Sequence, residues 1–254
     1  MTTVKQHLDD ISKIQSKYFI DIGASCSTEH SQSEVLLELG FSGLMFECDP
    51  QKFPIQFQKM MGKNVIVSPE KVTVDNILHL LESNNVPDGF YLTIDIDGYD
   101  YFVLDKILSK YKPQLIVSEI NEKIPAGVKF TVEYDNDYFW DGSHYYGYSL
   151  SMLSELLEKY GYKIEELDYN NVILTPGLQV EDIKDVYERG YLNRPERKSM
   201  FYYNADFEIV YSLPKEQQLD FIRNKFLPTE NERQSRLGHQ IDGKKISKRN
   251  FILY

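Results

Sequence analysis

Short apolar stretches alternate along the chain with longer stretches in which apolar residues recur at helical spacing. Uninterrupted apolar stretches are typical of strands buried on both faces, and the helical spacing is typical of helices with one face on a core. Such alternation predicts a parallel sheet with right-handed crossovers. Strands are expected from residue 18 to the turn at Asp21–Gly23 and at 43–46, 64–67, 90–96 and 114–117, with helices at 4–14, 31–39, 53–61, 77–81 and 102–111.

The alternation ends after residue 160. Residues 162–167 and 172–174 have the pattern of two strands, joined by Tyr169, Asn170 and Asn171. Asparagine tolerates the backbone of tight turns, so the pair of asparagines predicts an antiparallel hairpin. The expected fold class is therefore α/β, with a mostly parallel seven-stranded sheet that ends in an antiparallel hairpin.

Polar residues follow several of the expected strands at the point where each strand ends. The first strand breaks into a turn at Asp21 and Gly23, and the second is followed by Glu47. Ligands of such sheets bind just beyond the carboxyl ends of the strands, and glycine lets the backbone approach them closely. A carboxylate can accept hydrogen bonds from both hydroxyls of a ribose, which makes Glu47 a candidate ribose ligand. The fourth and fifth strands are followed by Asp95, Asp97, Glu119 and Asn121.

Composition favours a soluble, globular protein. Of the 254 residues, 42% are hydrophobic and 26% charged. No apolar stretch approaches the ~20 residues of a membrane span, and no charged-then-apolar leader is evident, so a cytoplasmic protein is expected. The two cysteines, Cys26 and Cys48, are too few for a disulfide framework or a cysteine zinc site.

Charge is distributed unevenly along the chain. The first 179 residues contain 14 lysines, no arginine and 27 acidic residues, whereas all seven arginines lie in the remainder. The net charge of −11 disfavours nonspecific binding of nucleic acid and favours a cationic ligand.

Three motifs, in order along the chain, resemble a known family. They are Asp21-Ile22-Gly23-Ala24, Phe46-Glu47-Cys48-Asp49-Pro50 and Ile94-Asp95-Ile96-Asp97-Gly98-Tyr99-Asp100-Tyr101. Together they resemble the S-adenosylmethionine-dependent class I methyltransferases, and most of all the FkbM-like branch. The likeness covers residues 18–176 and implies the Rossmann-like fold of that class. Residues 119–148 also resemble methyltransferases associated with bacterial surface-polysaccharide gene sets.

The resemblance implies that the protein binds S-adenosylmethionine and releases S-adenosylhomocysteine. Glu47 would hold the ribose, Lys71 or Val72 would border the adenine, and Asp95 would face the methionine amino group or the sulfonium. Carboxylates around a positive sulfonium are electrostatically favourable. The full set of implied cofactor-binding residues is Asp21, Ile22, Gly23, Ala24, Ser25, Glu47, Cys48, Lys71, Val72 and Asp95.

The acceptor is expected to bind at an aromatic-rich insertion, residues 122–148, because aromatic rings pack well against sugars and planar groups. His144 is the first candidate general base, since imidazole titrates near neutral pH, and Asp97 and Asp95 are the other candidate catalytic residues. The structural alternatives are that most of the aromatic rings anchor the loop and that His144 stabilises the loop. Candidate substrate-binding residues are Glu119, Asn121, Lys123, Tyr134, Trp140 and Tyr145.

Asp95, Asp97, Glu119 and Asn121 also offer the oxygen ligands that Mg²⁺ or Ca²⁺ prefers. We rank hydrogen-bonding roles ahead of a metal and assign no metal ligand. Two other functions remain open. A nicotinamide-dependent oxidoreductase is disfavoured because the G-x-G-x-x-G fingerprint is absent. A catalytically idle nucleotide-binding scaffold would bind cofactor without turnover.

The chain is expected to divide into a methyltransferase domain, 1–176, and a mostly helical C-terminal extension, 177–254, with helices at 180–188 and 215–226. The extension would pack on the domain or on a partner subunit, as in a homodimer, and its apolar end, 251–254, would dock. The basic residues of the extension suit phosphate or carboxylate, and their pairing with the acidic body of the chain is the favoured interpretation. These residues are Arg189, Arg194, Arg197 and Lys198. The activity predicted is O-methylation of a small, carbohydrate-linked or phosphate-linked acceptor in bacterial capsular polysaccharide biosynthesis.

Overall fold

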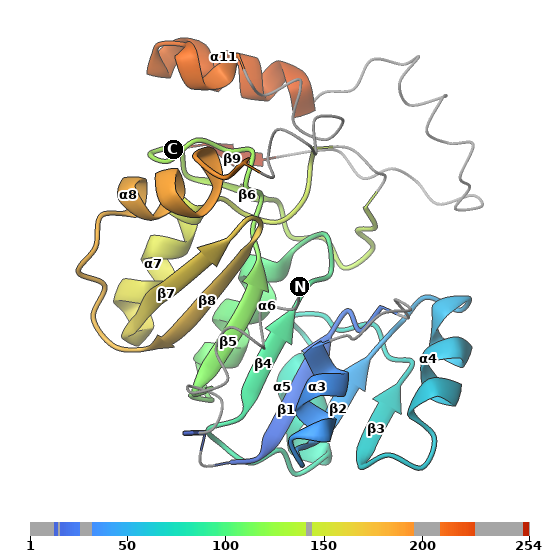
Figure 1. Ribbon diagram of the computed structural model, residues 1–254. Helices are drawn as coiled ribbons and strands as arrows, with labels where there is room; N and C mark the ends of the chain where they lie inside the picture. The colour runs from blue at the N-terminus through green and yellow to red at the C-terminus, as the bar shows by residue number, and fades with distance from the viewer. Residues whose placement is uncertain are drawn as a thin grey trace.

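A seven-stranded sheet forms the centre of the protein in a computed structural model (Figure 1), with the strand order β3-β2-β1-β4-β5-β8-β7. The strands are β1 Tyr18–Ile22, β2 Ser42–Phe46, β3 Val65–Ser68, β4 Tyr91–Ile94, β5 Leu115–Glu119, β7 Tyr162–Asp168 and β8 Asn171–Pro176. The structure describes residues 13–14, 16–25, 32–140, 144–195, 209–226 and 251–253.

Strands β1 to β5 pair in parallel, and β8 runs antiparallel to both of its neighbours, β5 and β7. The register sets Ile22 of β1 beside Phe46 of β2 and Ile94 of β4. The carboxyl ends of these strands therefore meet at one edge of the sheet. The expected α/β class, with a mostly parallel sheet closed by a hairpin, is confirmed.

Helices cover both faces of the sheet. One face carries α3 (Gln32–Glu38) and α4 (Lys52–Met60), and the other carries α5 (Ile77–Ser83), α6 (Asp100–Leu108) and α7 (Leu150–Tyr160). Successive side chains of a strand point to opposite faces. Phe19 accordingly packs in the cluster with α3 and α4, and Ile20 packs in the cluster with α5, α6 and α7. This double coverage explains why the central strands β1, β2 and β4 are mostly apolar.

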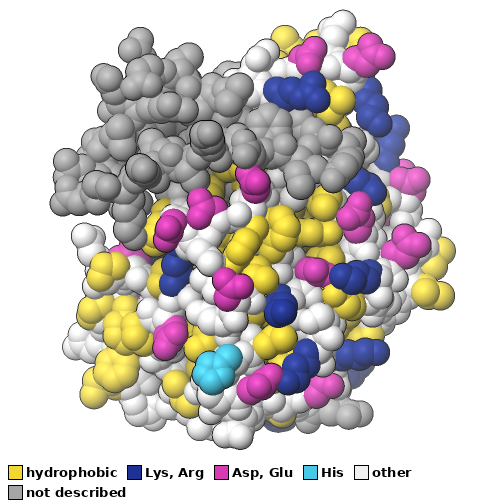
Figure 2. Space-filling view, turned by 180° about the vertical axis from the view of Figure 1, so that it is seen from behind, with side chains coloured by type: hydrophobic (Ala, Val, Ile, Leu, Met, Phe, Trp, Pro, Cys, Tyr) yellow, Lys and Arg dark blue, Asp and Glu magenta, His cyan; other side chains and the backbone are white. Residues whose placement is uncertain are grey.

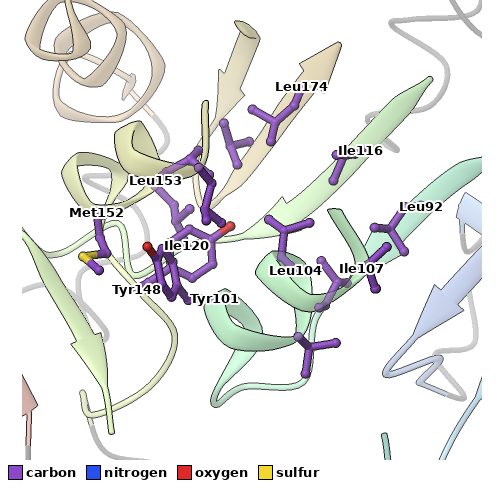
Figure 3. Close-up of a cluster of buried hydrophobic side chains, with 14 of the residues drawn as sticks. Leu92, Tyr101, Leu104, Ile107, Ile116, Ile120, Tyr148, Met152, Leu153 and Leu174 are labelled. Carbon is purple, nitrogen blue, oxygen red and sulfur yellow. The ribbon is translucent and has the colours of Figure 1, made fainter. Parts of the chain in front are cut away.

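The larger core supports the ends of β4 and β5. Figure 3 shows Leu104 and Ile107 of α6 and Leu153 of α7 gathered with Leu92 and Ile116 of the sheet, and all five belong to one buried cluster. Burying side chains of this size stabilises each by about 1.5–3 kcal/mol relative to exposure. The strand ends that carry polar residues are therefore held by a well-filled core.

Two local expectations differ from the structure. The hairpin turn consists of Tyr169 and Asn170, with Asn171 paired to Asp168 in the ladder, and the positive φ of +62° falls on Tyr169. Strand β4 ends at Ile94 instead of residue 96, because Asp97 adopts a left-handed backbone with φ +53° that cannot continue a strand. The sequence pattern shows where a turn lies better than which residue bends it.

The insertion and the C-terminal extension contain additional elements. A strand that the sequence pattern did not reveal, β6 (Phe130–Val132), pairs antiparallel with β9 (Phe251–Leu253). The extension contains α8 (Ile183–Tyr187), a π-helical turn (Glu188–Leu192), a 3₁₀ turn (Val210–Ser212) and α11 (Lys215–Phe226). The boundary between domain and extension at residue 177 remains a prediction.

Two extension arginines pair with acidic residues. Arg194 lies 2.8 Å from a carboxylate oxygen of Asp168, and Arg189 binds Glu181. Ile14 packs in the smaller core, whereas residues 4–12 of the expected first helix, together with Cys26, Arg197 and Lys198, lie outside the described residues. Among the described residues, no helix has the length and apolar character to cross a membrane.

Candidate functional site

The ends of β1 and β4 meet at Gly23. Its N–H and that of Ala24 both donate to the carbonyl oxygen of Phe46, and Asp95 N–H donates to the Ile22 carbonyl at 2.9 Å. Gly23 has φ +88°, and a Cβ at this position would lie 1.7 Å from the Asp95 carbonyl oxygen. Any other residue would force the two strand ends apart. Gly23 is therefore required by the contact between strands as well as by its backbone conformation.

Asp21 lies beneath this turn instead of at the open edge. Its carboxylate accepts a short hydrogen bond from the Ser33 hydroxyl of α3, and the residue is buried. Burial raises the pKa of Asp21 to about 6, although the Ser33 bond opposes the shift. The expected direct contact of Asp21 with a ligand is thus replaced by a bond that fixes α3 against β1, with Ile22 and Ala24 buried beside it.

Glu47 follows β2 and keeps one oxygen available. Its Oε1 accepts from Asp49 N–H at 2.8 Å, and no described residue donates to Oε2. Burial is the main cause that raises its pKa. Cys48, next in the chain, is exposed, as is Ser25 after the first turn. The carboxylate is fixed by its own loop with a free lone pair at the strand edge, which is the geometry that a ribose hydroxyl needs.

Asp100 shapes the turn after β4. Its two carboxylate oxygens accept from Ile96 N–H and Gly98 N–H, both at 2.9 Å, and the side chain is buried. Burial raises the pKa of Asp100 to about 6 against the effect of these backbone bonds. The bonds hold Asp97, which lies between Ile96 and Gly98, in its left-handed conformation.

Asp95 and Glu119 form a carboxyl pair at the ends of β4 and β5. They share a hydrogen bond, and Glu119 Oε1 also accepts from Asn170 Nδ2 at 2.6 Å. Burial, followed by the charges of Asp97 and Asp100, raises the pKa of Asp95 to about 7, and burial also raises the pKa of Glu119 well above its usual value. Solvent nevertheless reaches the Asp95 side chain. Asp95 therefore has many protein groups around it and still remains within reach of a ligand.

One carboxylate oxygen from each of Asp95, Asp97 and Glu119 lies within 4.8 Å of the others. A hard cation can bridge oxygens at such a spacing, but acidic groups gather in proteins without an ion as well. The Asp95 and Glu119 side chains already interact with each other, and Glu119 also accepts from Asn170. We therefore retain the hydrogen-bonding roles.

The insertion reaches back across the cofactor side of the sheet. Lys71 Nζ donates to the carbonyl oxygens of Asn136 at 2.5 Å and Tyr138 at 3.1 Å, and lies 4.0 Å from the Phe139 ring centre. The adjacent Val72 is buried, and its carbonyl accepts from the Tyr99 hydroxyl. Lys71 therefore holds residues 136–139 in place, which differs from its expected position bordering an adenine.

Most of the expected substrate-binding residues are occupied within the protein. Asn121, Lys123 and Tyr145 are buried. The amide of Asn121 donates to the carbonyls of His144 and Tyr146, and Lys123 Nζ binds Glu122 at 2.9 Å. We assign these residues a supporting role because their polar groups bind other parts of the insertion.

The remaining acceptor candidates divide by exposure. Tyr134 accepts from Val74 N–H at 3.0 Å, and Tyr145 accepts from Glu133 N–H at 3.1 Å, so both rings anchor the chain. Trp140 keeps 38% of its surface exposed, and Phe139 keeps 39%. His144 is half-buried, and its neighbours Asp141, Gly142 and Ser143 lie outside the described residues. Trp140 is thus the expected aromatic contact that stays available to a ligand.

Sequence analysis missed three residues that organise the site. Ser33 binds Asp21, Asn170 binds Glu119, and Tyr146 closes a buried ring of bonds with Glu122 and Lys123. Each is a polar residue whose partner comes from another element. The only signal available was the position of Asn170 in a turn that an antiparallel hairpin returns to the end of β5.

The polar strand ends fit S-adenosylmethionine. Glu47 Oε2, to which no described residue donates, suits a ribose hydroxyl, and Gly23 allows the ends of β1 and β4 to meet beside it. The carboxylates of Asp95 and Asp97 create a negative field at the same edge, which suits a positive sulfonium. A candidate ribose acceptor after β2 and candidate counter-charges after β4 thus lie at one edge of the sheet, on either side of β1.

Comparison with known proteins agrees with this geometry. The family model described as "Methyltransferase FkbM domain" matches residues 17–164, which is more than half of the chain. That match includes the first five strands and the insertion. Among curated proteins, none matches the sequence.

Solved structures with a similar chain trace include three methyltransferases. A putative tRNA (m1A22) methyltransferase of Streptococcus pneumoniae, in complex with S-adenosyl-L-methionine, is 13% identical with a TM-score of 0.49, covering 92% of this chain and 98% of its own. TrmK of M. capricolum, in complex with S-adenosyl-homocysteine, is 9% identical with a TM-score of 0.46. The match covers 94% of this chain and 98% of TrmK. Magnesium protoporphyrin IX methyltransferase of Synechocystis PCC 6803 is 9% identical with a TM-score of 0.45, covering 68% and 76%. Similarity at this level concerns the chain trace alone.

Proposed function

The chain belongs to the FkbM methyltransferase domain family of S-adenosylmethionine-dependent enzymes, and on that premise we propose that it methylates a hydroxyl group of a small or carbohydrate-linked acceptor. The observation that carries the proposal is the accessible Asp95 carboxyl beside Glu119, with the free oxygen of Glu47 along the same sheet edge. One end of this edge suits the ribose of the methyl donor, and the other offers a base.

Asp95 is the base that the geometry supports best. When bound, S-adenosylmethionine supplies an electrophilic methyl group whose thioether leaves without a proton. The acceptor hydroxyl must lose its proton as the new bond forms, and a group with a pKa near the working pH takes it most effectively. Burial is the main cause that raises the pKa of Asp95 to about 7, and burial also raises the pKa of the neighbouring Glu119. Asp97 and His144 are the alternative bases.

The chemistry of the edge favours a neutral polyol near the methylated oxygen. Carboxyl groups accept hydrogen bonds from sugar hydroxyls, and the exposed rings of Trp140 and Phe139 offer apolar faces for a sugar ring. A phosphate beside Asp95, Asp97 and Glu119 would meet like charge, so a phosphate-linked acceptor must carry its phosphate away from this cluster. A place in surface-polysaccharide biosynthesis is proposed from the sequence resemblance.

Binding of the product tests the cofactor half of the proposal. Glu47→Ala should weaken S-adenosylhomocysteine binding about 10- to 100-fold, the effect of losing a hydrogen bond to a charged group. Titration calorimetry measures the change, with the exposed Glu38→Gln as a control that leaves affinity intact. Unchanged affinity in Glu47→Ala, or binding of NAD by the native protein, would contradict the proposal.

Turnover tests the base. Sugar nucleotides and simple glycosides are screened with S-adenosylmethionine labelled in the methyl group. On any acceptor found, Asp95→Asn should lower kcat about 10²- to 10⁴-fold while S-adenosylhomocysteine affinity changes little. If Asp97→Asn or His144→Gln abolishes turnover and Asp95→Asn does not, the base is misassigned. If the native protein binds cofactor but transfers no methyl group to any acceptor, it is a scaffold.

A further inference from the structure

The sheet has a free edge at β3. Only β2 pairs with this strand among the described residues. The carbonyl oxygens of Asn64 and Ser68 accept from β2, at 3.2 and 3.1 Å, so the alternate residues Val65 and Val67 face away from β2. The Val65 N–H donates to the Lys63 carbonyl at 2.9 Å, which leaves the Val65 carbonyl and both backbone groups of Val67 for a further strand. Residues 65–68 contain no charged side chain that would block another strand. An edge of this kind is a template for strand pairing.

An apolar flank of α4 borders this edge. Gln56 and Met60 face the core, and Lys59 on one flank reaches Glu34 of α3 at 3.2 Å. The opposite flank therefore points away from α3, toward the outer side of the sheet. It carries Phe57, which is 49% exposed and, just beyond the helix, Met61, which is 67% exposed.

Hydrophobic side chains gather on the rim of the molecule formed by α4 and β3, which is at the left in Figure 2. Besides Phe57 and Met61, this rim includes Ile66 of β3, which is 51% exposed. Val65 and Val67 pack in the cluster on the α4 face, so Ile66 extends from the opposite face of the sheet. Apolar surface thus lies on both faces of the sheet at β3, whose outer edge has no partner strand among the described residues. We call β3 together with Phe57, Met61 and Ile66 the β3 rim.

Charge around the rim is self-complementary. Residues 51–69 contain lysines but no acidic residue, although the whole chain has a net charge of −11. Lys63 precedes β3, and the exposed Glu70 follows it. In an antiparallel pair, the beginning of one strand lies next to the end of the other. Two copies of this rim would therefore place opposite charges together at both ends.

We propose that the β3 rim is the interface of a homodimer in which the two β3 strands pair antiparallel across a two-fold axis. Outward-facing residues must meet outward-facing residues, so Val65 lies opposite Val67 of the second copy and Ile66 lies on the axis. Lys63 then lies next to Glu70 of the second copy. The axis is perpendicular to the sheet, so both α4 helices lie on the same face and their apolar flanks meet.

A second copy fits the rim better than the other possible occupants. A two-fold interface uses one patch twice, and this patch presents donors, acceptors, apolar flanks and opposite charges in the order that self-pairing needs. An anionic membrane would meet Lys63 but also the acidic body of the chain. An unrelated extended peptide would satisfy the strand but leave the α4 flank uncovered.

Sedimentation equilibrium of the full chain and of charge-reversed variants tests the proposal. The native protein should be dimeric, and Lys63→Glu should weaken dimerisation about tenfold or more, because it places like charges together at both ends. Glu70→Lys should have a similar effect. The double variant Lys63→Glu/Glu70→Lys should restore the dimer, although it does not restore the contact of Lys63 with Glu34. Rescue would therefore separate charge pairing from loss of local structure.

Hydrophobic substitutions complete the test. Met61→Lys should weaken the dimer, whereas Val180→Lys, at a residue 92% exposed in the C-terminal extension, should leave it intact. Circular dichroism checks that each variant is folded. A monomeric native protein, failure of the double variant to re-form the dimer, or a dimer that is insensitive to all rim variants would overturn the proposal. Cosedimentation of a monomeric native protein with phosphatidylglycerol vesicles would assign the rim to a membrane instead.

Discussion

The two halves of the site are built by contacts of very different range. On the cofactor side, Glu47 is bound by Asp49 two residues away, and Asp100 by Ile96 four residues away. On the acceptor side, Glu119 is bound by Asn170, 51 residues away, and the Glu122 carbonyl accepts from Tyr187, 65 residues away. The polar side chains Glu47 and Asp100 of the first half are held by local bonds, although the strands that carry them meet through the long-range contact of Gly23 with Asp95. Polar groups of the second half are held by residues far away in the sequence.

The difference also separates residues that can meet a ligand from residues that support them. The cofactor side leaves Glu47 Oε2 without a described partner, and Asp95 at the junction of the halves is accessible. On the acceptor side, Asn121, Lys123 and Tyr146 are buried within the insertion. A long insertion must satisfy its own polar backbone before it can bind anything, so most of its polar side chains serve that purpose.

The largest expected effect concerns the cofactor half. Gly23→Ala should abolish cofactor binding, because the new Cβ collides with the Asp95 carbonyl oxygen and separates β1 from β4. Gly40→Ala is a matched control, since Gly40 has a similar φ of +82° but no atom within 4 Å of the added Cβ. The control should cost about 1–2 kcal/mol, which is the penalty of the left-handed backbone alone.

Thermal unfolding and S-adenosylhomocysteine titration measure both variants. The difference between them isolates the contact of β1 with β4 from the conformational preference of glycine. If the two variants lose the same stability and Gly23→Ala still binds S-adenosylhomocysteine, the cofactor half does not depend on this close approach.

Short range is also the reason that candidate residues of the cofactor half could be named from sequence, and their contacts with the cofactor stay a prediction. Apolar stretches identified β1, β2 and β4, and the residues that follow them, Gly23 and Glu47, were assigned because parallel strands end at one edge. The errors are local. Asp21 was assigned to the ligand, but its partner Ser33 comes from the next helix, and no spacing rule indicates which side a strand aspartate faces.

The sequence indicated where the acceptor half lies but not how its residues are arranged. Aromatic density marked the insertion, yet β6 is a three-residue strand whose partner β9 lies more than 100 residues further along the chain. In the sequence, Tyr134, Tyr145 and Trp140 are all aromatic residues of the same insertion. Only the structure shows that the hydroxyls of the two tyrosines bind backbone groups. Long-range contacts determine which ring is exposed, and such contacts cannot be read from a single sequence.

An intermediate effect is expected where the halves meet. Folding raises the pKa of Asp95 to about 7, while an aspartate in the unfolded chain titrates near about 4. Between these values the folded state binds more protons than the unfolded state, so the stability of the protein without ligand should fall as pH rises from about 4 to about 7. Folding also raises the pKa values of Asp21 and Asp100 to about 6, so these two residues likewise lower the stability as pH rises.

Asp95→Asn should flatten this dependence, because the amide is neutral at every pH. Thermal unfolding between pH 5 and pH 8 measures the slope, and Glu158→Gln, which removes an exposed charge from α7, is the control for the effect of net charge. Equal slopes in the two variants would mean that Asp95 is not desolvated, and the pairing with Glu119 would lose its support.

The smallest expected effect concerns Lys71, which links the halves. Lys71→Met removes two hydrogen bonds to the carbonyls of Asn136 and Tyr138, so amides of residues 134–140 should exchange hydrogen faster. S-adenosylhomocysteine affinity should fall only by roughly threefold, the effect of about 0.5–1 kcal/mol. Lys17→Met, at an exposed lysine before β1, is the control. Exchange that stays slow while affinity falls tenfold or more would mean that Lys71 borders the adenine, as the sequence resemblance implied, and that the insertion is held by the acceptor half alone.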